Sequence, residues 1–137
     1  ILYSVVWKTE GAGSDVCCNT RPQLELYAPQ LLRSELIRHR PRMAKQMGKT
    51  VAQVTEILEL LLHRVTFIDA SLIGDTAWKQ AKTLVASVDP NDEDYVALAL
   101  HLGFPLWTGD MKLTKALKGH SVRLVTTAEV RQMHIGR

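Results

Sequence analysis

The segment from Ser87 to Leu113 constrains the fold of this 137-residue chain most, because it predicts a helix, a strand and a second helix in immediate succession. Asn91 is a suitable N-cap, and three acids at 92–94 would occupy the first helical turn, where the helix dipole favours anions. Gly103 is typical of a helix end. Phe104–Trp107 is a short apolar stretch that predicts a buried strand leading into the next helix.

The same alternation of helices and short strands continues along the whole sequence. Strands are expected at Leu24–Tyr27, Arg64–Asp69 and Val122–Thr126, and Ile1–Trp7 fits either a strand or the first turns of a helix. Helices are expected around the cysteines and at Pro29–Pro41, Met43–Met47, Val51–His63 (capped by Thr50), Ala70–Val88, Asp110–Leu117 and Thr127–His134. This pattern predicts an α/β fold of one domain, residues 1–137, in which helices sandwich a mainly parallel central sheet in three layers.

Composition narrows the class of protein. The hydrophobic fraction of 46% and the charged fraction of 23% are those of an ordinary globular domain. No apolar run approaches the about 20 residues that a membrane helix needs, so we expect no membrane partner. Cys17 and Cys18 are adjacent and unsuited to a disulfide framework, which favours reduced thiols and a cytoplasmic location.

Basic residues gather in two groups and give the chain a net charge of +3. The first group lies between Arg33 and Lys49, and the second follows Asp110. Such groups are either solvated helix faces or contacts to a polyanion, and the sequence leaves both interpretations open. The candidate nucleic-acid-binding residues are Arg38, Arg40, Arg42, Lys112 and Lys115.

Three acids are the candidate catalytic residues. Asp92 is expected at a helix start and Asp110 at the carboxyl end of a strand, where open α/β sheets bind ligands. Glu35 lies on or beside the apolar stripe of its helix, where a carboxylate needs a partner or a function. The alternatives are that both aspartates only cap helices and that Glu35 reaches out to water. Carboxylates without histidine or cysteine suit Mg²⁺ or Mn²⁺, which can activate water against a phosphodiester.

Three blocks of the sequence together resemble a PIN domain, as in VapC-type toxin ribonucleases. They are L-E-L-Y-A-P-x-x-L-x-x-E-L, D-P-N-D-E-D-Y-V-A-L-A-L-H-L-G and L-W-T-G-D-M-K-L. The resemblance implies an endoribonuclease that uses Mg²⁺ or Mn²⁺, with Glu35, Asp92 and Asp110 as its second, third and fourth acids. It also implies that Thr108 assists Asp110 and that Asp94 is an auxiliary metal ligand. An antitoxin protein is the implied partner, and a homodimer formed by the helices at 43–63 is a further expectation.

The start of the chain departs from the family pattern. PIN domains begin with a strand that ends in an Asp-x-Asn motif, and Ile1 stands where that motif should just have ended. We therefore expect the central strand and the first acid to be missing through truncation, with Ile1–Trp7 serving as a strand as the alternative. Glu10 and Asp15 are poor substitutes because each lies a helix away.

The missing acid leaves a second functional hypothesis open, a catalytically impaired PIN-fold module that binds RNA or protein. A phosphoacceptor receiver domain fits less well, because no lysine follows the strand at Val122–Thr126.

Overall fold

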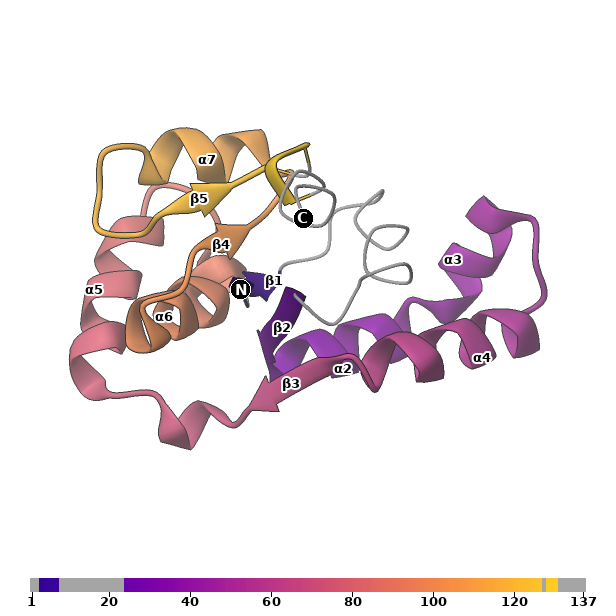
Figure 1. The fold of residues 1–137 in the computed structure, drawn as a ribbon. Coiled ribbons are helices and arrows are strands. Elements are labelled where there is room, and N and C mark those ends of the chain that lie inside the picture. Colours follow the sequence, from indigo (N-terminus) through magenta and orange to yellow (C-terminus); the bar gives the residue numbers. More distant parts are fainter. Residues whose placement is uncertain (1–2, 8–23, 127, 131–137) are drawn as a thin grey trace.

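The computed structural model describes residues 3–7, 24–126 and 128–130, and Figure 1 shows their arrangement. Five strands form one sheet in the order β3-β2-β1-β4-β5, and every neighbouring pair is parallel. The strands are β1 (Tyr3–Trp7), β2 (Leu24–Pro29), β3 (Val65–Ile68), β4 (Leu106–Trp107) and β5 (Leu124–Val125). Because the strands are parallel, all their carboxyl ends lie at one edge of the sheet.

The expectation that the central strand is missing is wrong. β1 occupies the middle of the sheet and pairs with β2 on one side and with β4 on the other. Val5 and Val6 are completely buried, so the apolar start of the chain supplies the core that a central strand must have. The alternative, in which the start of the chain serves as a strand, is therefore correct for the described residues Tyr3–Trp7. Glu10 and Asp15, which the sequence makes poor substitutes for the first acid, lie outside the described residues.

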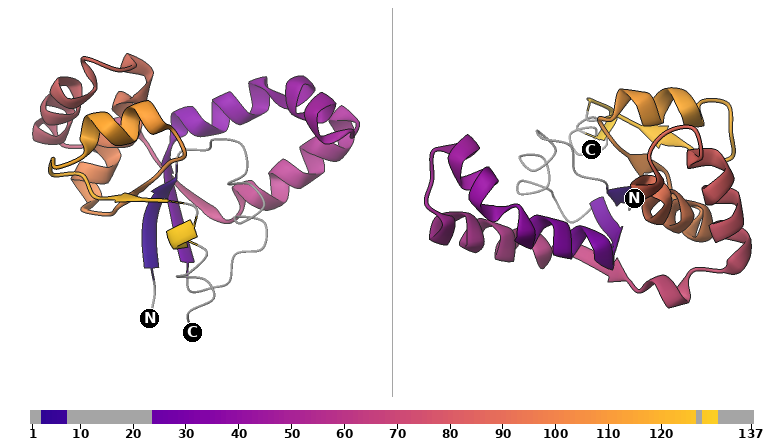
Figure 2. Two further views of the ribbon diagram at one scale, coloured as in Figure 1. Left: turned by 90° about the horizontal axis from the view of Figure 1, so that it is seen from above. Right: turned by 180° about the vertical axis from the view of Figure 1, so that it is seen from behind.

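Helices flank the sheet and connect its strands, which confirms the expected three-layer α/β class. They are α2 (Gln30–Arg38), α3 (Arg40–Met47), α4 (Val51–Leu62), α5 (Asp75–Val85), α6 (Glu93–Leu102) and α7 (Met111–Leu117), with short 3₁₀ turns η1 (Ala70–Leu72) and η2 (Pro90–Asp92). Both views in Figure 2 show α5, α6 and α7 gathered together, whereas α3 and α4 project away as a helical hairpin. None of the described helices is long and apolar enough to cross a membrane.

Several expected boundaries shift for local reasons. The helix expected at Ala70–Val88 is broken, because the Asp69 carboxylate caps η1 and α5 begins only after Gly74. Asn91 is not the cap before α6. Asp89 accepts a hydrogen bond from the Asn91 backbone N–H and starts η2, and α6 follows from Glu93. The helix expected around Cys17 and Cys18 lies outside the described residues.

The α3–α4 hairpin has its own internal ties. Thr50 and Gln53 form a reciprocal capping box at the start of α4, as a helix start at Thr50 predicts. Arg40 donates from Nε to the carbonyl of Ile37 at 3.0 Å and from Nη1 to the hydroxyl of Thr55 at 3.2 Å. These bonds fix the junction of α2 and α3 against α4, so Arg40 has a structural role beside any role in RNA binding.

The core lies where α6 covers the centre of the sheet. Five consecutive residues of α6, from Tyr95 to Ala99, are buried, and α6 contacts both β1 and β2. Trp107, at the end of β4, is the largest fully buried side chain among the residues whose burial is described. Gly103 ends α6 with a φ of 71°, the left-handed conformation expected there, and the chain enters β4 two residues later. This short connection makes α6 run antiparallel to β4, so α6 begins at the carboxyl edge.

Candidate functional site

The carboxyl edge of the sheet contains a point where the direction of chain winding changes. The chain passes from β1 to β2 on one side, whereas it passes from β4 to β5 on the other. In open α/β sheets a crevice for ligands forms at such a switch point, outside the carboxyl ends of the two strands. Thr108 and Asp110 follow β4 directly, and α6 begins at the same edge. The fold therefore brings the candidate acids to the edge where binding sites form.

Glu35 lies in the second turn of α2 and contacts α6 through its side chain. It is half-buried, and its Oε1 accepts a hydrogen bond of 2.7 Å from the hydroxyl of Tyr95. The two residues are separated by 60 positions in the sequence. The Glu35 carboxylate thus has a defined partner at the packed face of its helix, and the alternative in which it merely extends into water does not describe this structure.

Asp92 and Asp94 flank the start of α6. Asp92 is only 3% exposed, and its side chain makes no capping hydrogen bond at the start of this helix. The interpretation of Asp92 as a simple helix cap therefore does not describe the structure. Asp94 is half-buried in the first turn. Partial burial, and then the charges of Glu93 and Glu35, raise the pKa of Asp94 above its usual value.

The pKa of Tyr95 is also raised above its usual value, in part by nearby negative charges. Burial is the largest cause that raises it, followed by the hydrogen bond to Glu35 and by the charges of Glu35, Asp94 and Asp92. Three acids, from α2, η2 and α6, thus act on one buried phenol. Sequence reasoning missed Tyr95. The signal available was its position three residues after Asp92, which places both side chains near one face of the helix start.

Asp110 lies at the start of α7 and is a helix cap. Its Oδ1 accepts hydrogen bonds from the backbone N–H groups of Lys112 (3.0 Å) and Leu113 (3.2 Å). The buried hydroxyl of Thr108 accepts a hydrogen bond of 3.0 Å from the Asp110 backbone N–H, so Thr108 shapes the turn that presents Asp110. A cap uses one carboxylate oxygen, and a second oxygen remains on the same side chain for other ligands.

Asp110 also lines an open cleft of about 580 Å³. Ser87, Val88 and Asp89 form one wall, after α5, and the opposite wall comes from α7 with Lys112, Lys115 and Ala116. Two ammonium groups and two carboxylates therefore border the same cleft. This arrangement can accept a phosphate group beside Asp110 through the lysines, because an ammonium is a compact charge with three donors.

The acids offer only oxygen ligands, which is the donor type that Mg²⁺ and Mn²⁺ prefer. Within residues 3–7, 24–126 and 128–130, no three His, Cys, Asp or Glu side chains gather closely enough to form a complete metal site. Mg²⁺ usually keeps several waters and takes one or two carboxylates from the protein. The charge of Glu35 acts on Asp94, so these two carboxylates lie within electrostatic reach of each other.

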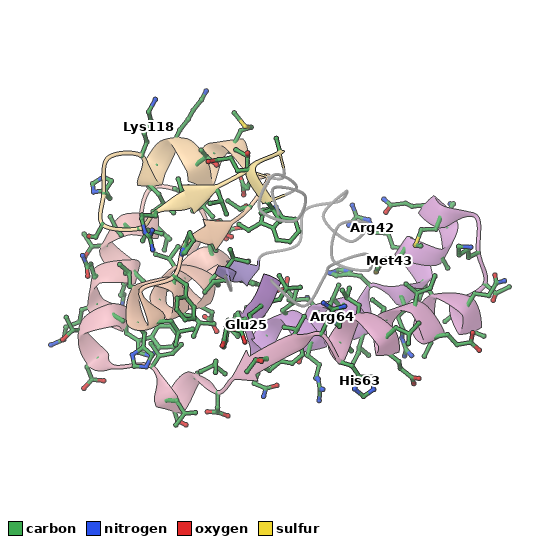
Figure 3. All side chains as sticks on the ribbon, viewed as in Figure 1. Glu25, Arg42, Met43, His63, Arg64 and Lys118 are labelled. Atoms are coloured by element: carbon green, nitrogen blue, oxygen red, sulfur yellow. The ribbon has the colours of Figure 1, made fainter. Side chains whose placement is uncertain are left out.

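The two basic groups lie on separate parts of the molecule. Arg38 ends α2 and Arg42 lies in α3, and both are exposed. Lys112 and Lys115 are exposed on α7. Figure 3 labels Arg42 on the hairpin and Lys118 at the end of α7, with the sheet between these parts. A polyanion that contacts both groups must therefore pass over the sheet rather than lie on one helix face.

Comparison with known proteins shows which family this chain belongs to. The chain belongs to the PIN-domain family, whose profile matches residues 4–134. Its fold is similar to that in a crystal structure of VapBC2 from Rickettsia felis bound to a DNA fragment from their promoter. That match has a TM-score of 0.62 and 15% sequence identity, and it covers 90% of this chain and 98% of the other. No curated protein matches the chain by sequence.

The capping role of Asp110 predicts a difference between two substitutions. Asp110→Ala removes the acceptor for two backbone N–H groups and should lower the free energy of unfolding by about 1 kcal/mol. Asp110→Asn retains a side-chain oxygen at the same position and should leave stability within about 0.5 kcal/mol of the parent. Urea unfolding of the three proteins measures this difference. Equal losses in both variants would contradict the capping role.

Proposed function

We propose that this protein is a metal-dependent endoribonuclease whose acids at the carboxyl edge of the sheet bind Mg²⁺ or Mn²⁺. The observation that carries the proposal is the 2.7 Å hydrogen bond that joins Glu35 of α2 to the buried Tyr95 of α6, the helix whose start carries Asp92 and Asp94, in a chain of the PIN-domain family. Proteins of this family are generally nucleases, and carboxylate clusters without nitrogen or sulfur ligands suit the divalent ions that assist phosphodiester hydrolysis.

Each residue has a proposed part in this reaction. Glu35, Asp92 and Asp110 would hold the ion, with Asp94 as an auxiliary ligand, and the bound ion supplies Lewis-acid stabilisation of charge on the phosphate oxygens. Thr108 supports the turn that presents Asp110. Lys112 and Lys115 border the cleft beside Asp110, where they would hold a neighbouring phosphate of the RNA. Arg38, Arg40 and Arg42 would contact the backbone farther along the strand.

The second candidate is a PIN-fold module that binds RNA or protein without cleaving it. The observation that favours it is the absence, in the described residues, of three acids close enough to form a complete metal site. The two candidates differ in whether the carboxylates matter, because the binding module depends only on the basic residues.

Cleavage of a structured RNA in Mn²⁺ tests the nuclease directly. The parent should cut the RNA, EDTA should abolish the reaction, and Asp92→Asn should slow it by about 100-fold or more, because a lost metal ligand removes several kcal/mol of transition-state stabilisation. Asp69→Asn is the matched control, since Asp69 is exposed after β3 and caps only η1. Its rate should equal that of the parent.

The same experiment separates the two candidate functions. RNA binding without cleavage, unchanged by Asp92→Asn, would contradict the nuclease and support the binding module.

Asp110→Asn adds a sharper comparison, because it should preserve the α7 cap while removing a negative charge. A large loss of rate in this variant, at parental stability, would assign Asp110 to the metal as well as to the helix.

Charge reversal tests the proposed path of the RNA backbone. The double variant Arg38→Glu and Arg42→Glu should weaken RNA binding by at least about tenfold at low salt. Its salt dependence should also be shallower, by about 0.7 in the log–log slope for each lost phosphate contact. The control is Lys79→Glu with Lys82→Glu, which makes the same charge change on the exposed face of α5. Equal weakening by both pairs would indicate that only net charge matters.

Two protein partners are also proposed. A small antitoxin protein follows from the family together with the fold likeness to VapBC2, and co-purification with a protein encoded beside it is the direct test.

A homodimer would use the α3–α4 hairpin, where Met47, Val51 and Leu60 are 42%, 44% and 71% exposed. These three exposed apolar side chains all belong to the projecting hairpin, which is why the hairpin is the proposed site of self-association.

Sedimentation velocity tests the homodimer. The parent should sediment as a dimer and Leu60→Glu as a monomer, because a charge in the centre of an apolar interface is costly to bury. Leu72→Glu is the matched control, since Leu72 is 64% exposed on η1, away from the hairpin. A monomeric parent would overturn the proposed homodimer, and so would dissociation by both variants to the same extent.

A further inference from the structure

We propose that Tyr95 is a positioning residue that holds the Glu35 carboxylate in the orientation needed to bind the divalent ion. This inference rests on the proposed nuclease function and adds a residue that sequence reasoning did not find. Tyr95 does not touch the ion or the RNA in this proposal. It acts only through Glu35.

The contact has the geometry of a directing hydrogen bond. The Tyr95 hydroxyl donates to Oε1 of Glu35 at 2.7 Å, which is the usual length for a strong O–H···O bond. Hydrogen bonds in which one partner is charged are stronger than neutral ones. Because Oε1 is engaged by Tyr95, the carboxylate has a preferred rotation, and Oε2 is left as the atom directed to other ligands.

Each partner is held in place by its own helix. Tyr95 is 3% exposed and belongs to the buried run of α6, so its ring cannot rotate freely. Glu35 follows the buried residue Leu32 by one turn and precedes the buried Leu36 in α2. A glutamate has three side-chain torsions, and fixing them costs conformational entropy. Because a rigid donor fixes these torsions in the free protein, the side chain loses less conformational entropy when the ion binds.

The position of Tyr95 among the acids also favours this role. Asp92 and Asp94 lie in the same turn, and the charges of all three acids act on the phenol. The hydroxyl of a buried tyrosine needs a hydrogen-bond partner, and here that partner is a carboxylate 60 residues away in the sequence. When a residue that orients a metal ligand through a hydrogen bond is removed, metal affinity typically falls by about 10- to 100-fold.

The test is a cycle of Mn²⁺ titrations on the full chain. Four proteins are compared: the parent, Tyr95→Phe, Glu35→Gln and the double variant. Tyr95→Phe should weaken Mn²⁺ binding by about tenfold. In the Glu35→Gln background the same substitution should have almost no further effect, because its path to the ion is gone. An equal loss in both backgrounds would show a general structural effect and overturn the proposal.

Cleavage kinetics give a second readout that a structural role would not move in the same way. In Tyr95→Phe, the Mn²⁺ concentration for half-maximal cleavage should rise by about tenfold, the KM for RNA should stay at the parental value, and excess Mn²⁺ should restore the rate. A raised KM for RNA with unchanged Mn²⁺ dependence would overturn the proposal.

Tyr27→Phe is the matched control. Tyr27 also donates to a glutamate, Glu25, but at 3.5 Å and on the exposed side of β2, so its removal should leave Mn²⁺ binding unchanged. Glu35→Asp is a second variant, which keeps the charge and shortens the reach to Tyr95. It should lose Mn²⁺ affinity as Tyr95→Phe does, and parental affinity would count against the proposal.

The outcomes also separate this proposal from the function on which it rests. A parent that binds Mn²⁺ and cleaves RNA, beside a Tyr95→Phe variant identical to it, would overturn the role of Tyr95 alone. A parent that neither binds Mn²⁺ nor cleaves would overturn the nuclease and the role of Tyr95 together.

Discussion

The pairing of β1 with strands on both sides is the constraint on which the rest of the structure depends. Val5 and Val6 are completely buried there, so the centre of the sheet is held by backbone bonds to β2 and β4 and by side chains that contact no water. Since all five strands are parallel, this central pairing also fixes one edge as the carboxyl edge. The acids reach that edge because α2 follows β2, α6 precedes β4 and α7 follows β4.

The acids do not have equivalent roles. Asp110 is partly used by the backbone of α7, whereas Asp92 is buried and makes no capping bond at α6. Glu35 has a specific donor in Tyr95, which belongs to the same helix as Asp94. Burial and neighbouring negative charge both disfavour the ionised form of a carboxylic acid. Both effects apply to Asp94, because partial burial and the charges of Glu93 and Glu35 raise its pKa, and a bound cation would offset them.

Local patterns predicted most elements correctly because their signals lie within a few residues. The Thr50 cap, the left-handed Gly103 and the alternation of helix and strand are examples, and the expected fold class and family are confirmed. The central strand was predicted wrongly. An apolar run of seven residues is compatible with several structures, and its place in the sheet depends on partners distant in sequence. The role of Asp92 was similarly open, since an aspartate before a helix is usually a cap.

The sequence by itself determined the parallel α/β class, the acids available and the two basic groups, because periodicity, turn residues and composition are local properties. Only the tertiary structure decided that β1 is central, that Asp110 caps α7 whereas Asp92 is buried without capping α6, and that Tyr95 meets Glu35. The contact between Tyr95 and Glu35 joins residues 60 positions apart. It exists because α2 and α6 both pack against β2, and no local pattern specifies the distance between two helices that meet through a shared strand.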